Sequence, residues 1–283
     1  MIAFAVAVFW ADGLLDRQTL SGFWTSLFPD RTYPPSGMVL AAVTLAVLIP
    51  LAARELAALI RTGNMQCHAG MITLSAVAGC LTVYAMPQGL KGSTGVAIIA
   101  TVLVLAFAAT LLWHAHQAGV SGSIAAAGAT MFAVVLLGLM PGFYLAMRRW
   151  HSPWVVMAVL LIVKSCDIGA FFTGRSIGRH KLIPWLSPGK TWEGLFCGML
   201  TSALVALVFA VAGWVHITWW QGLIFGLVIG PIGQAGDLLE SLMKRDAEVK
   251  DSGHWIPGFG GILDVIDSPL FAAPFAYLLF SVF

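Results

Sequence analysis

A cluster of acidic and basic residues between positions 237 and 267 gives the strongest chemical signal in the sequence. Ten of the 28 charged residues lie in this window, and seven of those ten are carboxylates. Apolar runs long enough to cross a bilayer flank it, and a charge at membrane depth costs about 2.5–3.5 kcal/mol on insertion scales. Clustered carboxylates bind divalent metals, while Lys and Arg bind phosphate. The window therefore predicts a metal-assisted phosphate site at a membrane surface.

The spacing within this window favours binding of a polyphosphate–metal complex. Asp237, Ser241 and Lys244 follow an i, i+4, i+7 pattern at the end of an apolar run, so they share one helix face. Asp264 and Asp267, three residues apart, can face one way on the following helix. A metal ligand, a hydroxyl and a cation on one stripe, opposite two further acids, suit a phosphate bound through a cation.

A polar and glycine-rich connection joins these two predicted helices. Residues 257–261 read Pro-Gly-Phe-Gly-Gly, and glycines let backbone amides approach a phosphate closely. Asp246 and Glu248 lie earlier in the connection, in polar sequence, and we expect their side chains to be solvated. The acids embedded in apolar sequence are expected to have a function instead.

A second polar segment spans residues 164–193. Asp167 lies inside an apolar run, which indicates function or a buried ion pair. Ser187 followed by Pro188 predicts a helix start, and a helix N-terminus near Lys190 and Thr191 suits an anion. A phosphate-binding loop of the Walker type is excluded, because residue 184 is not the glycine that this motif requires. The segment's further cations also fit cytoplasmic topology and contact with anionic lipids.

The composition defines an all-α, polytopic membrane protein. The chain is 59% hydrophobic and 10% charged, with a mean hydropathy of +0.89, whereas globular proteins average about 25% charged residues. Each predicted span fits the roughly 20 residues that a helix needs to cross the hydrocarbon core. The spans are predicted at 37–60, 70–86, 95–113, 122–147, 153–174, 194–214, 220–243 and 262–283.

The N-terminal segment and the prolines affect this count and the shape of the helices. The first 13 residues form a short helix, an interfacial segment or the remainder of a longer helix, which gives eight or nine transmembrane helices in all. Pro141, Pro231, Pro269 and Pro274 interrupt apolar runs and are expected to break helices. We divide the chain into N-terminal helices, 1–150, and C-terminal helices that carry the site, 151–283.

The distribution of Lys and Arg predicts the orientation. With the 175–193 and 244–261 loops in the cytoplasm, nine basic residues lie inside and five outside, and Arg148 and Arg149 are the pair that fits least well. We therefore expect a site that faces the cytoplasm, in the inner membrane of a bacterium.

The residues from Ser241 to Asp267 resemble the signature of the phosphatidate cytidylyltransferases, the CDP-diacylglycerol synthases. That signature reads Ser-x-x-Lys-Arg, four residues, Lys-Asp, then Pro-Gly-His-Gly-Gly, two residues, Asp-Arg-x-Asp. The matching positions here are Ser241, Lys244, Arg245, Lys250, Asp251, residues 257–261, Asp264 and Asp267. Gly236-Asp237 and the Ser-Pro-Gly-Lys-Thr-Trp-Glu-Gly segment at 187–194 also resemble family motifs. The resemblance covers residues 160–283, while the first 150 resemble the family only as a set of apolar spans.

The resemblance implies an enzyme that joins phosphatidate and CTP into CDP-diacylglycerol and pyrophosphate. The phosphate of phosphatidate is ionised at neutral pH, so catalysis consists of positioning and charge neutralisation. Mg²⁺, with room for a second cation, is the expected cofactor. Its expected ligands are Asp237 and Asp264, completed by Asp267 and Asp251, with Asp167 as a supporting or cation ligand.

Cations and hydroxyls of the same motifs are expected to bind the substrates. Lys244 and Arg245 are expected to act in catalysis. Substrate-binding roles fall to Ser187, Lys190, Thr191, Ser241 and Lys250. We expect no nucleic-acid partner, and the sequence leaves a homodimer open.

Two departures from the signature keep alternatives open. Phe259 stands where the family has His, and Val265 where it has Arg. A related enzyme with another lipid phosphate or nucleotide, a divergent member of the family and an inactive scaffold therefore remain possible interpretations. An ion-coupled transporter fits less well, because the sequence shows no internal repeat.

Overall fold

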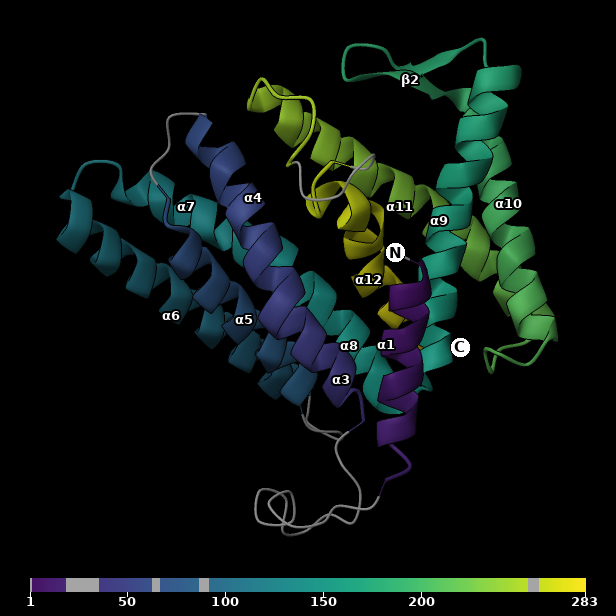
Figure 1. The fold of residues 1–283 in the computed structure, drawn as a ribbon, viewed down its shortest axis with the longest axis horizontal. Coiled ribbons are helices and arrows are strands. Elements are labelled where there is room, and N and C mark those ends of the chain that lie inside the picture. The colour runs from purple at the N-terminus through teal and green to yellow at the C-terminus, as the bar shows by residue number, and fades with distance from the viewer. Residues whose placement is uncertain (1, 19–35, 63–66, 87–91, 254–259) are drawn as a thin grey trace.

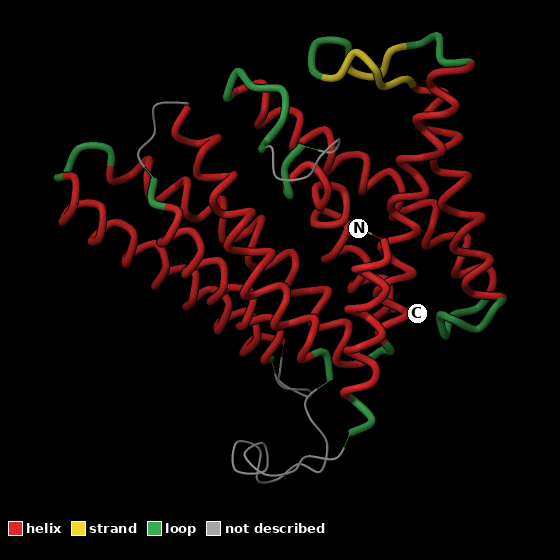
Figure 2. The backbone as a smooth tube through the Cα atoms, viewed as in Figure 1, coloured by secondary structure: helices red, strands yellow, loops and turns green. Residues whose placement is uncertain are grey.

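The computed structural model describes residues 2–18, 36–62, 67–86, 92–253 and 260–283, and these ranges are almost entirely helical (Figure 1). The N-terminal helices are α1 (Ile2–Leu15), α3 (Met38–Val43), α4 (Ile49–Thr62), α5 (Ala69–Ala85), α6 (Gly92–Ala118), α7 (Ser123–Ala133) and α8 (Met140–Trp150). The C-terminal helices are α9 (Pro153–Ser176), α10 (Trp192–Val211), α11 (Trp219–Asp246) and α12 (Leu263–Val282). Within the described ranges the strands are β1 (Lys181–Ile183) and β2 (Ser187–Thr191), seen as the yellow pair in Figure 2.

The predicted polytopic all-α fold is confirmed. Seven helices are long and apolar enough to cross a membrane, and two shorter apolar helices, Phe4–Leu15 and Ala69–Ala85, bring the described set to the expected size. The boundaries agree closely with the predicted runs, because each run ends where polar or turn-forming residues begin.

The predicted helix breaks at Pro231, Pro269 and Pro274 are wrong, because all three residues lie inside continuous helices. The predicted break at Pro141 is also wrong, but there the helix changes its hydrogen-bonding pattern. Pro141 follows a π-helical turn, η2 (Val134–Leu139), which joins α7 and α8 into one apolar rod, Ser123–Trp150. A second π-turn, η1 (Thr44–Leu48), precedes Pro50 in the same way. Such turns absorb the loss of a backbone donor without ending the helix.

Two apolar clusters hold the bundle together. One joins α3, α4, α5 and η2, and the other joins α8, α9, α10, α11 and α12. Leu263 and Leu270 of α12 belong to the first cluster, whereas Ala272 and Ala276 of the same helix belong to the second. Because α12 packs on both sides, it fixes the signature residues relative to the whole bundle. The domain boundary at residue 150 stays a prediction.

Close helix packing sets the positions of α10 and α11. A Cβ atom on Gly226 of α11 would lie 2.5 Å from the Cα atom of Ala203 in α10, a distance that real Cβ atoms do not reach. Small residues let helix backbones approach in this way in membranes. The helices that carry the site are therefore held at a fixed separation.

The predicted helix start at Ser187 and Pro188 is wrong. These residues form β2, which pairs antiparallel with β1 through Lys181 opposite Thr191 and Ile183 opposite Ser187. Helix α10 begins directly after β2, at Trp192. The Oγ1 atom of its N-cap residue, Thr191, accepts a hydrogen bond of 3.1 Å from the amide of Gly194. The strand pairing prevails because it gives backbone groups of β2 hydrogen-bond partners in β1.

Arg148 lies in a buried ion cluster at the end of α8. Its side chain is 2% exposed and donates to the Oδ2 atom of Asp12 over 2.6 Å and to Asp16. The other oxygen of Asp12 accepts the amides of Val39 and Leu40 at 2.9 and 3.1 Å. The arginine that fitted the charge rule least well therefore joins α1, α3 and α8 from inside the protein.

Candidate active site

A polar chamber of about 670 Å³ lies between the β1–β2 hairpin and helices α9–α12. Figure 1 shows the hairpin on the same side of the bundle as the C-terminal ends of α4 and α11, with the α10–α11 turn on the other side. Of the predicted site residues, the chamber is lined by Asp167, Ser187, Lys190, Thr191, Asp237, Asp264 and Asp267. It thus unites the two polar segments of the sequence in one place.

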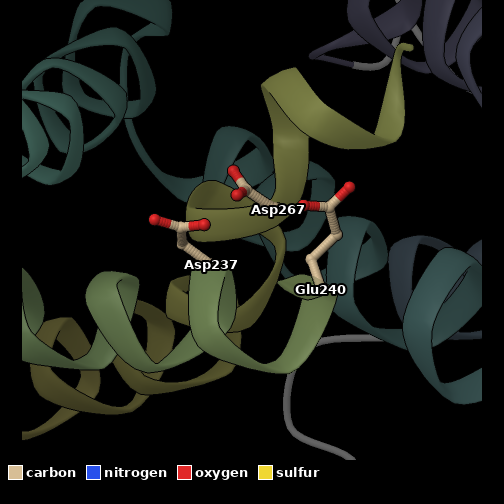
Figure 3. Close-up of side chains that lie close together, drawn as sticks. All are labelled: Asp237, Glu240 and Asp267. Carbon is tan, nitrogen blue, oxygen red and sulfur yellow. The ribbon is translucent and has the colours of Figure 1, made fainter. Parts of the chain in front are cut away.

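Three carboxylates meet where α11 and α12 face each other. Oxygen atoms of Asp237, Glu240 and Asp267 all lie within 4.8 Å of one another. Figure 3 shows Asp237 and Glu240 on successive turns of α11, with Asp267 directed between them from α12. The side chains of Glu240 and Asp267 are only 3% and 5% exposed. Like charges this close repel one another, so the arrangement fits a bound cation.

Glu240 has the least satisfied carboxylate of this cluster. Neither of its buried oxygens accepts a hydrogen bond of regular geometry from the described residues. Its Oε2 atom does lie 2.5 Å from the Nζ atom of Lys244, so the charge is partly balanced. A buried carboxylate without hydrogen bonds is costly, and a cation held with Asp237 and Asp267 would relieve that cost.

Lysines face these acids from strand β2 and from helix α9. The Nζ atom of Lys190 lies 2.8 Å from Asp237 and also donates to the carbonyl of Gln234 over 3.1 Å. Lys164 of α9 lies 3.2 Å from Asp167 and 3.3 Å from Asp267. These ammonium groups therefore stand at the chamber wall, where they can exchange a carboxylate partner for a phosphate.

Asp167 belongs to a supporting network beside the cluster. It accepts a hydrogen bond of 2.7 Å from Gln234 and one of 3.0 Å from the hydroxyl of Ser268. The same hydroxyl lies 3.2 Å from Asp267. Asp167 therefore orients Asp267 through Ser268 and Lys164, in keeping with its predicted supporting role, which stays a prediction.

Asp264 lines the chamber, but protein donors surround its carboxylate. Lys244 approaches Oδ1 at 2.6 Å, while Oδ2 accepts the amide of Ser252 at 3.0 Å, the hydroxyl of Ser252 at 2.9 Å and the amide of Gly261 at 2.7 Å. Gly260 adopts a φ of 90°, and a Cβ atom there would meet this carboxylate at 2.5 Å. The glycine pair thus brings the backbone to Asp264, where the sequence suggested a phosphate. A metal role for Asp264 remains a prediction.

Four further predicted residues do not belong to the chamber wall as the structure describes it. Arg245, Lys250 and Asp251 are exposed, Ser241 is half-buried, and none of the four is among the described residues that line the chamber. Val265 is half-buried in the first turn of α12 and likewise outside that lining. The departure at Phe259 falls outside the described residues.

An apolar groove of about 190 Å³ reaches the acids from another direction. It is lined by Phe132, Val135, Leu136 and Met140 on one wall and by residues of α11 and α12, including Leu239, Leu242, Met243 and Phe271, on the other. Glu240 and Asp267 lie in its lining as well. Asp267 therefore belongs to the walls of both the polar chamber and the apolar groove.

Sequence reasoning missed several residues of this site. Glu240 carried a signal, because it follows Asp237 by three residues and so points the same way. Gln234, Ser268 and Lys164 gave only weak signals, as single polar residues in apolar runs. Glu55, whose buried carboxylate contacts the signature segment from α4, lies nearly 200 residues away in sequence, so no spacing argument could find it.

The fold and the site define a class: an integral membrane protein whose helices hold an acidic cluster at the wall of a polar chamber that is also lined by lysines and an arginine. Residues 32–283 match the cytidylyltransferase family, and the chain belongs to that family. The family resemblance predicted from the signature is thereby confirmed.

Curated relatives carry a more specific name. The chain is 36% identical over 158 residues to the phosphatidate cytidylyltransferase of Bacillus subtilis, 46% over 124 residues to that of Staphylococcus epidermidis and 40% over 140 residues to that of Haemophilus influenzae. These matches cover 55%, 44% and 47% of this chain. They cover 59%, 48% and 48% of the relatives, so the chain spans about half to three fifths of their length.

Proposed function

We propose that the protein transfers the cytidylyl group of CTP to phosphatidate, giving CDP-diacylglycerol and pyrophosphate for phospholipid synthesis. One observation carries the proposal: Asp267 lies in the walls of both the polar chamber and the apolar groove. A water-soluble nucleotide and a membrane lipid need different surroundings, yet their phosphates must meet. The acidic cluster lies where the polar chamber and the apolar groove meet. The names of the relatives support the same reaction.

A divalent cation such as Mg²⁺ fits the cluster. Mg²⁺ prefers a few carboxylate oxygens together with substrate phosphate oxygens, and the unsatisfied oxygens of Glu240 adjoin those of Asp237 and Asp267. We propose these three residues as its ligands, and Asp264 and Asp251 as ligands of the completed shell or of a second cation. When bound, such an ion supplies positive charge to the phosphate oxygens.

The reaction itself needs positioning more than proton transfer. An anionic oxygen of the phosphatidate phosphate forms a bond to the α-phosphorus of CTP, while the bond from that phosphorus to the oxygen bridging to the β-phosphorus breaks. The electron pair leaves with pyrophosphate, so no general base is required. Lys164 and Lys190 stand beside the acids, and Arg175 and Lys181 line the same chamber. We propose that these four cations hold and orient the triphosphate.

The apolar groove suits the lipid. The side chains of Leu239 and Leu242 are 45% and 44% exposed, so its wall continues onto the outer surface of the bundle. We propose that an acyl chain lies along this wall while its phosphate reaches Glu240 and Asp267.

We further propose that the site faces the cytoplasm across a bacterial inner membrane. The loops on the hairpin side carry most of the Lys and Arg residues, which cytoplasmic loops favour. CTP is a cytoplasmic nucleotide, and the β1–β2 hairpin that lines the chamber lies on this side of the bundle (Figure 1). The relatives named above are bacterial proteins.

A second candidate is the same reaction with another lipid phosphate or another nucleotide. Val265 favours it, because an arginine at the signature position would add a cation near the first turn of α12. The absence of this arginine lowers the positive charge near the site and leaves the acidic cluster in place.

Turnover of purified protein in detergent tests both candidates. The protein is incubated with CTP and phosphatidate, with each of the other nucleoside triphosphates, and with other lipid phosphates, each with and without Mg²⁺. We expect CDP-diacylglycerol only with CTP, phosphatidate and Mg²⁺ together. Product from another pair alone would support the second candidate, and no product from any pair would support the inactive scaffold.

A further inference from the structure

Glu55 of α4 contacts the signature segment from the N-terminal half of the chain. Its side chain is buried, at 3% exposure. The Oε1 atom accepts the amide of Ile262 at 2.9 Å, and Oε2 accepts the amide of Leu263 at the same distance. The hydroxyl of Ser252 lies 3.3 Å from Oε2. One carboxylate thus accepts two backbone amides at the start of α12 and also lies next to the hydroxyl of Ser252.

These contacts cap α12. The first amides of a helix have no partner within the helix, and a negative charge there also interacts favourably with the positive end of the helix dipole. Asp264 and Asp267 follow within the next turn or so of the same helix. The direction in which α12 leaves Glu55 therefore determines where both acids point.

The glycines around this segment fit the carboxylate closely. A Cβ atom on Gly253 would lie 2.6 Å from Oε1 of Glu55, and one on Gly261 would lie 2.6 Å from Oε2. A side chain at either position would displace the carboxylate. Glu55 thus explains the absence of side chains at these two positions, as Asp264 does at Gly260.

A short path of hydrogen bonds and one ion pair leads from Glu55 to the acidic cluster. Ser252 contacts Glu55 and donates to Asp264 over 2.9 Å. Asp264 accepts from Lys244, whose ammonium group also lies 2.5 Å from Glu240. Each member of this path has its neighbour's position fixed by a short contact, so a loss at Glu55 reaches Glu240 of the cluster in four steps.

We propose that Glu55 is a positioning residue for the proposed reaction. It is not among the described residues that line the chamber, so it acts through α12 and Ser252. This inference rests on the proposed function, because it concerns the same acidic cluster. It assigns to the N-terminal helices, where the sequence resemblance is weakest, one residue that the site requires.

Glu55→Gln tests the proposal with little change of shape. The amide NH₂ group would face the backbone N–H of Ile262 or Leu263, so two donors would oppose each other. Losses of residues that orient metal ligands typically reduce activity or metal affinity by about 10–100-fold. Glu55→Asp retains the charge and should recover part of the loss. Glu248→Gln is the matched control, because that glutamate is exposed.

Three measurements on each purified protein separate positioning from general stability. We expect Glu55→Gln to reduce kcat far more than it raises KM for CTP, to weaken Mn²⁺ binding measured without substrates by about tenfold, and to speed amide hydrogen exchange in residues 260–264. The control should match the wild type in all three. Melting temperatures report how much protein is folded.

Two results would overturn the proposal. One is wild-type kcat, Mn²⁺ affinity and exchange rates in Glu55→Gln. The other is lost activity that follows only the unfolded fraction, with normal Mn²⁺ binding in the folded protein, since that would make Glu55 purely structural. If the wild type fails to act on CTP and phosphatidate, the proposed function fails, while Mn²⁺ binding and hydrogen exchange still decide the role of Glu55.

Discussion

Two buried charged clusters in this bundle differ in how well their carboxylates are satisfied. At the end of α8, Arg148 meets Asp12 and Asp16, and the remaining oxygen of Asp12 accepts two backbone amides. At the junction of α11 and α12, Asp237, Glu240 and Asp267 crowd together, and the oxygens of Glu240 lack hydrogen bonds from the described residues. The first cluster is complete as it stands, whereas the second has capacity for a ligand.

The contrast shows how a structural cluster of charges can be told from a functional one. Both interrupt apolar sequence, and both contain residues that are almost inaccessible to solvent. The cluster around Arg148 binds helices to one another, so its removal should affect folding. The acidic cluster adjoins both a polar chamber and an apolar groove, so its removal should affect chemistry.

Of the changes proposed, metal removal should have the largest effect on turnover. It should act on the acidic cluster and leave the cluster around Arg148 unaffected. A metal ion contributes several kcal/mol of transition-state stabilisation, and each 1.4 kcal/mol or so corresponds to a factor of ten in rate. We therefore expect a chelator to reduce turnover by about a thousandfold, with recovery on adding Mg²⁺. Full turnover after exhaustive chelation would show that the carboxylates work without a cation.

Asp237→Asn should reduce turnover by more than about a hundredfold, because it removes a negative charge from the proposed ligand set. The variant should melt near the wild-type temperature, since the relieved repulsion between the acids offsets the lost ion pair with Lys190. Turnover and thermal unfolding in the same detergent provide the two readings. A variant with normal turnover would remove Asp237 from the metal site.

Asp264→Asn tests whether Asp264 binds the metal directly or instead stabilises the backbone at Ser252 and Gly261. We expect a comparable loss of turnover, of more than about a hundredfold, together with a lower melting temperature, because the carboxylate accepts from Lys244, Ser252 and Gly261. Lost turnover with unchanged stability and abolished Mn²⁺ binding would instead favour direct ligation by Asp264.

Arg148→Met should show the opposite behaviour. Removing one partner of a buried ion pair typically costs about 3–5 kcal/mol, because the other charge stays buried and unpaired. We expect a lower melting temperature with wild-type kcat per folded molecule. A large loss of kcat in fully folded Arg148→Met would contradict the division between a structural and a functional cluster.

Asp246→Asn should have the smallest effect. The side chain is exposed, and surface substitutions usually change stability by less than about 0.5 kcal/mol. Because about 0.5 kcal/mol corresponds to roughly a factor of two in rate, we expect turnover within about twofold of the wild type. If Asp246 proved essential while Asp237 did not, the assignment of the cluster would be wrong.

The sequence predicted the spans well and the site in part, for different physical reasons. Hydropathy depends on local composition, so the limits of α9, α11 and α12 could be read directly. The helix breaks predicted at the prolines and the helix start predicted at Ser187 were wrong, because π-turns, helix packing and the β1–β2 pairing outweigh local propensity. Glu240 was predictable from its spacing to Asp237. Glu55 was not, because its contact with Ile262 depends on how α4 packs against α12.

The position of a label within CTP tests the central claim most directly. CTP labelled at the α-phosphorus and CTP labelled at the γ-phosphorus are each incubated with phosphatidate, Mg²⁺ and the purified protein, and the lipid is then extracted. If the acidic cluster joins the two phosphates as proposed, the α-label enters the lipid and the γ-label leaves as pyrophosphate. A γ-label in the lipid would indicate phosphoryl transfer, and no label in the lipid would contradict cytidylyl transfer to phosphatidate.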